Sequence, residues 1–258
     1  MNLLFIGDVV GQSGCDFLES RMYKLKREYD IDVTVVNGEN SAQGNGITPQ
    51  SYRQLLNMGA DVVTTGNHSF RRREAEGLYD TNEQLLRPAN YPEGVMGHGV
   101  TYIDMCPYKI AVVNLMGTMY MEAVENPFNY VDKLLESIDT PNIIVDFHAE
   151  ATSEKKAMGF YLQKRCTAVL GTHTHVQTAD ECIFENGMGY ITDVGMTGPI
   201  KSVLGVKPEL AIKKQREKLP VRFETADGDC KMDCILFQID EKSGKTIKLN
   251  RESYASCL

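Results

Sequence analysis

Short polar motifs recur along this chain of 258 residues, and each directly follows a run of apolar, mostly β-branched residues. A short apolar run bounded by turn residues is typical of a buried strand, and ligand sites in α/β sheets form beyond the carboxyl ends of strands. The motifs therefore predict one site built from several strand ends. Five motifs carry Asp, Glu, Asn or His: Gly7-Asp8, Gly38-Glu39-Asn40, Gly66-Asn67-His68, Asp146-Phe147-His148 and Gly171-Thr172-His173-Thr174-His175.

Strand and helix patterns alternate over most of the chain and predict a layered α/β fold. Strands are expected at residues 3–7, 33–37, 61–65, 109–115, 142–147 and 167–170, and helices at 15–29, 48–59, 128–138 and 153–165. After about Cys182 the chain is expected to be mostly β, with strands at 182–185, 188–192, 221–225, 232–239 and 246–250 and a hairpin turn at Asn186-Gly187. No repeat or long linker interrupts this order, so residues 1–258 are expected to form a single domain.

Composition and charge exclude several classes of protein. The net charge is −8 and no basic stripe is present, which argues against binding of duplex nucleic acid. The run Arg71-Arg72-Arg73 is expected to be a solvated face, with contact to a substrate phosphate as the less favoured interpretation. No apolar run approaches the ~20 residues of a membrane span, and no basic leader precedes the first strand, so the cytoplasm is the default location. Cys230 and Cys234 lack a second cysteine pair, which favours packing over a zinc site.

Seven side chains in these motifs are candidate metal ligands. They mix oxygen and nitrogen donors and include no thiolate, which favours manganese, iron or zinc. Seven donors are too many for one ion and about right for two, and a carboxylate could bridge ions ~3.5–4 Å apart. The candidates are Asp8, Glu39, Asn40, Asn67, His148, His173 and His175.

A two-metal site of this kind predicts hydrolysis of a phosphate ester, with a metal-bridging hydroxide as the nucleophile. His68 follows the candidate ligand Asn67 and cannot easily bind the same ion, so we expect it to face the substrate as a general acid. Two divalent ions with the carboxylates of Asp8 and Glu39 leave a charge of +2, or +1 with hydroxide. That charge favours a phosphodiester, although a further carboxylate such as Asp146 would change the count.

Other interpretations stay open at this point. Gly66-Asn67-His68 alone could be a turn, and His98 is interpreted as an ordinary loop residue. A phosphomonoesterase or 5′-nucleotidase-like enzyme could use the same ligands, and a metal-bound regulatory protein could act by binding, with vestigial catalysis. An amidohydrolase is disfavoured because His-x-His there normally follows the first barrel strand. No phosphate-binding P-loop or Gly-x-Ser-x-Gly elbow supports a kinase or a serine hydrolase.

The five motifs, together with the segment from Thr192 to Pro199, resemble the YmdB-like branch of the calcineurin-type metallophosphoesterases as far as about Gly205. The resemblance implies a four-layer α/β/β/α sandwich of two mixed β-sheets, a di-iron or di-manganese centre and hydrolysis of cyclic nucleotide phosphodiesters. It also implies a homo-oligomer, a dimer or tetramer, with a bacterial regulatory role. Carried over by position, the seven candidates above would be the ligands and His68 the proton donor.

Two departures from the family pattern stand out. Most metallophosphoesterases have Asp-x-His in the first motif, whereas Val10 occupies that histidine position here, and Asn40 would supply the missing ligand. Many relatives also carry an aromatic-acidic pair after Gly-Asn-His, where this chain has Ser69-Phe70 followed by three arginines. The surroundings of His68 and the substrate preference are therefore open. Asp146, Glu150 and Asp193 either orient the histidines or cap loops, and we expect Asp193 to do the former.

Overall fold

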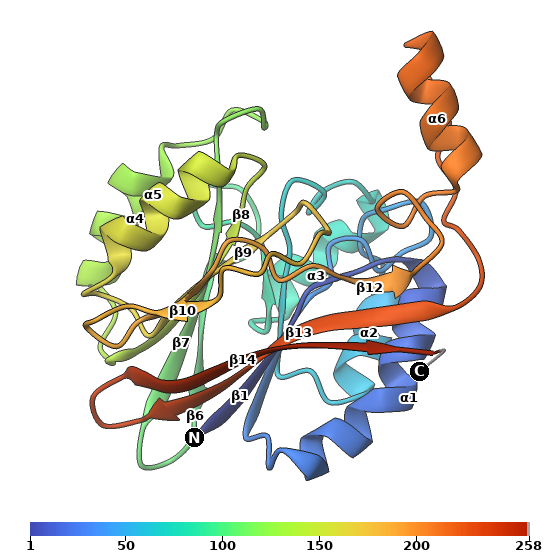
Figure 1. Ribbon diagram of the computed structural model, residues 1–258. Coiled ribbons are helices and arrows are strands. Elements are labelled where there is room, and N and C mark those ends of the chain that lie inside the picture. The colour runs from blue at the N-terminus through green and yellow to red at the C-terminus, as the bar shows by residue number, and fades with distance from the viewer. Residues whose placement is uncertain (257–258) are drawn as a thin grey trace.

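The computed structural model describes residues 1–256, whose strands form two mixed sheets packed face to face (Figure 1). In sheet A the order is β2-β12-β13-β1-β3-β4-β5, with β14 paired to β13; in sheet B it is β10-β11-β9-β8-β7-β6. Sheet A consists of β1 (Asn2–Ile6), β2 (Asp8–Val9), β3 (Val33–Asn37), β4 (Val62–Thr64), β5 (Leu85–Leu86), β12 (Met196–Pro199), β13 (Cys230–Asp240) and β14 (Lys245–Ala255). Sheet B consists of β6 (Val100–Asp104), β7 (Lys109–Met116), β8 (Asn142–His148), β9 (Ala168–Thr172), β10 (Cys182–Ile183) and β11 (Gly189–Ile191).

Helices cover the outer face of each sheet. Beside sheet A lie α1 (Gly11–Glu28), α2 (Pro49–Asn57), the short 3₁₀ turn η1 (Arg73–Ala75) and α3 (Glu76–Thr81), and beside sheet B lie α4 (Pro127–Glu136) and α5 (Thr152–Leu162). The predicted four-layer α/β/β/α sandwich is therefore confirmed. The remaining helix, α6 (Pro208–Glu217), extends away from both sheets (Figure 1).

The apolar runs are strands buried on both faces, and β1 illustrates why. Its side chains alternate, so Leu3 and Phe5 pack between the two sheets while Leu4 and Ile6 pack against the helices of the outer layer. Such strands read as continuous apolar segments because neither face meets water. Buried apolar side chains thus fill three layers, one between the sheets and one under each helical face.

Parallel pairing gathers the polar motifs at one edge. In sheet A, β1, β3, β4 and β5 are mutually parallel, and in sheet B the parallel strands are β7, β8, β9 and β11. The carboxyl ends within each parallel set therefore face the same way. Each of the five motifs lies at or just beyond such an end, those of β1, β3, β4, β8 and β9.

The sequence predicts the start of α2 correctly. Thr48 is its N-cap, with Oγ1 accepting from the Ser51 backbone N–H at 3.1 Å while Ser51 Oγ accepts from the Thr48 N–H at 3.0 Å. The predicted hairpin at Asn186-Gly187 is confirmed by antiparallel pairing of β10 with β11. Cys230 and Cys234 are buried in β13 with unpaired thiols, in agreement with a packing role.

The structure corrects two predictions for the last part of the chain. The predicted strand at residues 221–225 is wrong: the segment has no adjacent strand, and a single bridge joins Thr225 to Val206. Its alternating pattern does not reflect a buried face, because Phe223 is 44% exposed. The mostly-β interpretation also misses α6, which begins at Pro208, a residue suited to the first position of a helix. Because α6 extends away from the packed layers, its residues are mainly exposed, and Ala211 is the buried one.

The N-terminal boundary of α1 also differs from the prediction. The helix begins at Gly11, four residues before the predicted start, where the backbone takes a positive φ of 65° that suits glycine. No helix within residues 1–256 is long and apolar enough to cross a membrane.

Candidate metal centre

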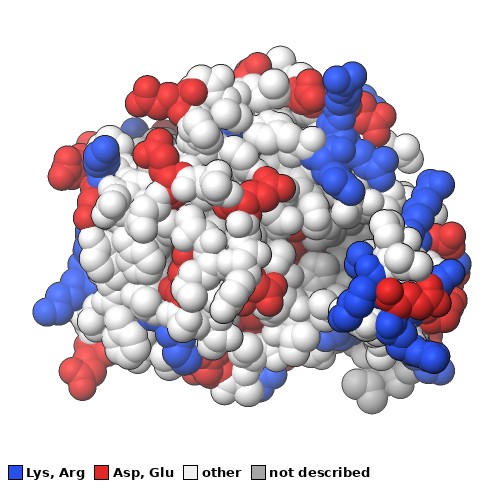
Figure 2. Space-filling view, turned by 90° about the horizontal axis from the view of Figure 1, so that it is seen from above, with Lys and Arg blue, Asp and Glu red and all other residues white. Residues whose placement is uncertain are grey.

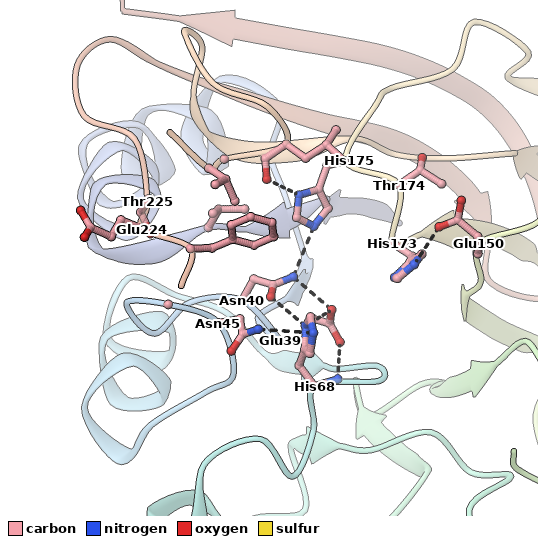
Figure 3. A pocket seen from close by; sticks show the side chains of 16 residues that line it. Glu39, Asn40, Asn45, His68, Glu150, His173, Thr174, His175, Glu224 and Thr225 are labelled. Carbon is pink, nitrogen blue, oxygen red and sulfur yellow. Dashed lines mark hydrogen bonds and ion pairs between the residues drawn. The ribbon is translucent and has the colours of Figure 1, made fainter. Parts of the chain in front are cut away.

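All eight predicted site residues meet at the shared strand edge, around a pocket of about 300 Å³, of which Figure 3 shows the residues that line it. Glu39, Asn40, His68, His173 and His175 line the pocket itself. The other three, Asp8, Asn67 and His148, contact these residues from beneath, as the distances below describe. The structure therefore brings together the complete set of residues that the motifs suggested.

One group of donors surrounds His148. Its Nε2 lies 3.0 Å from Asn67 Oδ1, 3.1 Å from His173 Nδ1 and 3.3 Å from Glu39 Oε1. Glu39, His148 and His173 offer ligand atoms that all lie within 4.8 Å of one another. These short separations between donor atoms match the space that one metal ion would occupy.

A second group surrounds His175. Its Nε2 lies 3.5 Å from Asp8 Oδ1 and 3.3 Å from Asn40 Nδ2, and Asn40 Nδ2 in turn donates to Glu39 Oε1 at 3.0 Å. Glu39 thus contacts both groups. This is the position that a bridging carboxylate requires.

Each of the three histidines points one ring nitrogen inward and binds an oxygen with the other. His148 Nδ1 lies 2.9 Å from Thr172 Oγ1, and His173 Nε2 lies 3.0 Å from Glu150 Oε2. His175 Nδ1 lies 3.0 Å from the backbone oxygen of Leu204. An outer N–H donated to oxygen leaves the inner nitrogen with a free lone pair, as metal-binding histidines require.

The two carboxylates of the site, those of Asp8 and Glu39, are anionic, and their basic partners are histidines. Burial opposes ionisation, yet His175 holds the pKa of Asp8 below its ordinary value, and His148 and His68 hold that of Glu39 well below. Within residues 1–256, neither carboxylate forms an ion pair with Lys or Arg. Imidazoles are therefore the side chains that can offer positive charge to these two buried carboxylates, and this favours binding of cations.

The pKa values of His148 and His173 shift in opposite directions, for different reasons. Burial disfavours protonation of His148, but the contact with Glu39 raises its pKa to about 9. Burial, assisted by the neighbouring His148, lowers the pKa of His173 to about 3. His148 therefore takes up the positive charge that the carboxylates attract, in a place where a metal ion would compete with the proton.

An unsatisfied atom also indicates a missing partner. Asp8 Oδ1 is buried and has no hydrogen-bond partner among residues 1–256, although His175 Nε2 lies 3.5 Å away. A buried carboxylate oxygen left in this way costs free energy unless an ion binds it. Oxygen donors from Asp, Glu and Asn with three imidazoles suit iron, manganese or zinc, so the residues present fit a centre of two such ions.

His68 lies at the mouth of this donor set. Its backbone N–H donates to Glu39 Oε2 at 3.1 Å, and its Nδ1 lies 3.1 Å from Glu39 Oε1 and 3.0 Å from Asn40 Oδ1. Nε2, the other ring nitrogen, lies 3.4 Å from Asn45 Nδ2 at the pocket wall (Figure 3). The ring is thus anchored through one nitrogen and presents the other to the pocket.

Three further carboxylates near the site have distinct contacts. Glu150 contacts His173 directly, whereas Asp146 accepts from Thr172 Oγ1 at 2.6 Å and so acts on His148 through that hydroxyl. Asp193 Oδ2 accepts from the Thr174 backbone N–H at 3.0 Å, between the two histidines of the last motif. Asp193 therefore orients these histidines through the backbone and contacts neither ring.

Sequence reasoning misses several contributors. Thr172 lies inside a recognised motif, but nothing in the motif marks its hydroxyl as a partner of His148. Leu204 contributes a backbone oxygen, and Phe223 and Thr225 form a wall of the pocket from the segment that was predicted to be a strand. The tail beyond Val206, where no motif was found, therefore contributes to the site.

Comparisons with known proteins show which proteins this chain is similar to. A family model described as YmdB-like protein matches residues 4–251. The 2′,3′-cyclic-nucleotide 2′-phosphodiesterase of Bacillus subtilis (strain 168) is 45% identical over 253 residues, which are 97% of this chain and 96% of that protein. A solved hypothetical protein from Thermus thermophilus superposes with a TM-score of 0.94 at 35% identity, over 99% of both chains. A solved phosphatase from Mycoplasma pneumoniae superposes with a TM-score of 0.95 at 32% identity, over 99% of this chain and 93% of that one.

Proposed function

Because this chain belongs to the YmdB-like family of metallophosphoesterases, we propose that it hydrolyses 2′,3′-cyclic nucleotides at a centre of two metal ions. The chain is an enzyme of the phosphodiesterase class, as its 45% identity to a named cyclic-nucleotide phosphodiesterase indicates. In the proposed reaction, water oxygen bonds to phosphorus, the P–O2′ bond breaks and O2′ gains a proton. The product is a nucleoside 3′-phosphate.

The observation that carries the proposal is the orientation of His148, His173 and His175. The inner nitrogens of His148 and His175 lie 3.3 and 3.5 Å from the carboxylates of Glu39 and Asp8. The inner nitrogen of His173 lies 3.1 Å from that of His148. An oxygen atom holds the outer nitrogen of each of the three rings. Core histidines with a structural role have no reason to converge in this way, whereas metal ligands do. The unsatisfied Asp8 Oδ1 at the same place supports the same conclusion.

We assign the donors to two ions of iron or manganese. One would be held by Asn67, His148 and His173, and the other by Asp8, Asn40 and His175, with Glu39 touching both. When bound, two such ions supply an activated water nucleophile and neutralise charge on the phosphoryl oxygens. The mixture of imidazole, amide and carboxylate donors suits either metal.

His68 is the proposed proton donor to O2′. Glu39 and Asn40 accept from Nδ1, which fixes the ring and keeps Nε2 directed to the pocket. A positioned acid that protonates a leaving alkoxide contributes typically 10²–10⁴-fold to the rate. Asn45 Nδ2, 3.4 Å from Nε2, marks the side of the ring on which the substrate would lie.

Hydrolysis of phosphomonoesters is the second candidate function, favoured by the description of the M. pneumoniae relative as a phosphatase. The same donor set would serve both reactions. With a bound hydroxide the site would carry a charge of +1, which a diester monoanion would neutralise and a monoester dianion would exceed by one negative charge. We therefore place the diester first.

The proposal is tested with adenosine 2′,3′-cyclic phosphate and metal-reconstituted protein. We expect adenosine 3′-phosphate as the product, a 10²–10⁴-fold lower kcat for His68→Ala, and loss of both metal and activity for Asp8→Ala. His98→Ala is the matched control, because His98 is exposed and lies outside the pocket.

Three outcomes would contradict parts of the proposal. Full activity of His68→Ala would show that His68 is not the general acid. Faster release of inorganic phosphate from adenosine 3′-phosphate than cleavage of the cyclic ester would favour the phosphomonoesterase. No turnover by protein that holds two metal ions would favour a regulatory binding role.

A further inference from the structure

A second, more polar cavity adjoins the active-site pocket and shares part of its wall. Its volume is about 840 Å³, and Gly44, Asn45, Phe223, Glu224 and Thr225 line both cavities. Figure 2 shows a hollow right of centre on this face, with Lys and Arg side chains gathered on two sides of it. We call this cavity the basic groove, after the four cations that line it: Arg71, Arg72, Lys207 and Arg222.

The basic groove has an excess of positive charge on an acidic protein. Its four cations face two carboxylates, Glu224 and Asp227, which leaves +2 in a chain whose net charge is −8. Lys207 Nζ lies 2.8 Å from Glu224 Oε2. Within residues 1–256, no carboxylate forms an ion pair with any of the three arginines. Their charge is therefore available to an anion.

One of the arginines, Arg72, is connected to the proposed general acid by Asn45. Arg72 donates from Nε to the Asn45 backbone oxygen at 3.0 Å and from Nη2 to the Gln43 backbone oxygen. The Asn45 side chain, in turn, lies 3.4 Å from His68 Nε2. An anion in the basic groove would thus lie one residue away from the proposed general acid. Arg71 and Arg72 line this groove, whereas Arg73 does not.

We propose that the basic groove binds a second phosphate of the substrate, attached through O5′ of the nucleoside whose cyclic phosphate is hydrolysed. This inference rests on the proposed function. A 2′,3′-cyclic phosphate occupies O2′ and O3′, so O5′ is the ribose hydroxyl that can carry another phosphate. Arginine suits this role because its planar guanidinium group can donate two parallel hydrogen bonds to two oxygens of one phosphate.

The phosphate on O5′ has two chemical sources. It is a monoester in a free 5′-phosphorylated nucleotide and a diester at the 3′ end of an RNA strand. Phe223, which is 44% exposed between the two cavities, offers an aromatic face on which a base could stack. A volume larger than that of the active-site pocket leaves room for such a preceding nucleotide.

The test compares kcat/KM for three substrates: adenosine 2′,3′-cyclic phosphate, its 5′-phosphorylated form, and the dinucleotide ApA ending in a 2′,3′-cyclic phosphate. We expect wild-type protein to favour the substrates with a phosphate on O5′ by about tenfold or more. Arg71→Gln and Arg222→Gln should each lower that preference severalfold. Arg73→Gln is the matched control, since it removes the same charge from an exposed neighbour that does not line the groove.

A binding measurement completes the test. Calorimetric titration with adenosine 3′,5′-bisphosphate and adenosine 3′-phosphate, the products of the first two substrates, should show tighter binding of the bisphosphate, reduced in Arg71→Gln. Preference for the dinucleotide over the 5′-phosphorylated nucleotide would identify an RNA end as the source, and the reverse would identify the free nucleotide.

Two results separate this inference from the proposed function. Hydrolysis of all three substrates with equal kcat/KM, and equal Kd for the two products, would overturn the inference and leave the proposed function intact. Failure to hydrolyse any of the three would contradict the proposed function and the inference together.

Discussion

Two metal-ligand candidates have backbone conformations that histidine rarely adopts. His173 and His175 have φ values of 99° and 63°, in the left-handed region that favours glycine. Such residues cost roughly 1–3 kcal/mol each and persist where their surroundings hold them in place. The Thr174 N–H donates to Asp193 and the His173 N–H to Asp8, at 3.0 and 3.2 Å. The carboxylates of Asp193 and Asp8 thus stabilise the strained turn that directs both histidine rings to the site.

We expect His173→Gly to be more stable than His173→Ala in metal-free protein, by about 1 kcal/mol, because glycine tolerates the positive φ that strains alanine. Both variants lose the same ring, so the comparison isolates the backbone. Urea denaturation monitored by circular dichroism measures the difference. An alanine variant as stable as the glycine variant would show that the turn is not strained.

The candidate ligand side chains could be predicted from the sequence, but the oxygen atoms that hold the outer nitrogens of the histidine rings could not. Asp8, Glu39 and the histidines are visible because their residue types are those that bind metals and because each follows an apolar run. Leu204 contributes through its backbone oxygen, so its side chain carries no signal. Thr172 is one of many threonines at strand ends, and its role depends on where His148 comes to lie.

At the scale of single elements, glycines allow the strand ends to approach one another. A Cβ on Gly66, just after β4, would lie 2.1 Å from His148 Cδ2, and one on Gly171 would lie 1.7 Å from the Thr192 backbone oxygen. Neither approach is possible for a residue with a side chain. The glycines of the Gly-Asn-His and Gly-Thr-His motifs therefore set how closely the candidate ligands approach one another.

We predict that Gly66→Ala lowers metal content to below half of the wild-type value, because the added methyl group would displace His148. Gly77→Ala is the matched control, since a Cβ at Gly77 in α3 meets nothing within 4 Å. Inductively coupled plasma mass spectrometry of the purified proteins measures the metal. Unchanged content in Gly66→Ala would show that His148 has room to move.

Strands were predicted correctly where two buried faces produce a continuous apolar run, as in β1, β3 and β8. The segment at residues 221–225 was mistaken for a strand because alternation does not reveal whether a neighbouring strand exists. Helix α6 was missed because its mainly exposed residues show little apolar periodicity. Both errors concern segments that extend from the packed layers.

At the scale of the whole molecule, a polar cluster joins the two sheets beneath the candidate metal centre. Asp146 of β8 accepts from Thr64 Oγ1 at 2.5 Å and from Asn37 Nδ2 at 3.1 Å, both in sheet A, and from Thr172 Oγ1 in its own sheet at 2.6 Å. Burial raises the pKa of Asp146 to about 6. This cluster holds the strand ends of one sheet in register with those of the other.

Thr64→Val should lower the free energy of unfolding by roughly 1–3 kcal/mol, because it removes a hydrogen bond from a buried carboxyl group. Thr34→Val is the matched control: Thr34 is equally buried in sheet A, but its hydroxyl has no partner within residues 1–256. We expect that variant to be neutral or slightly stabilised. Equal destabilisation of both, measured by chemical denaturation, would assign the effect to packing.

The order of strands was beyond sequence reasoning. Strand β13, formed by residues near the end of the chain, inserts antiparallel between β12 and β1. Pairing between strands that are far apart in the sequence leaves no signal in the local residue pattern. Any apolar strand could occupy the position between β12 and β1. The layers could be inferred from the family resemblance, whereas the position of β13 follows from packing of the complete molecule.

The most direct test of the central claim is anomalous X-ray diffraction at the iron and manganese absorption edges from crystals of the protein purified with these metals. The account predicts two peaks per chain. One should lie among Asn67, His148 and His173 and the other among Asp8, Asn40 and His175, with Glu39 in contact with both. A single peak, or peaks away from these residues, would contradict a two-metal centre.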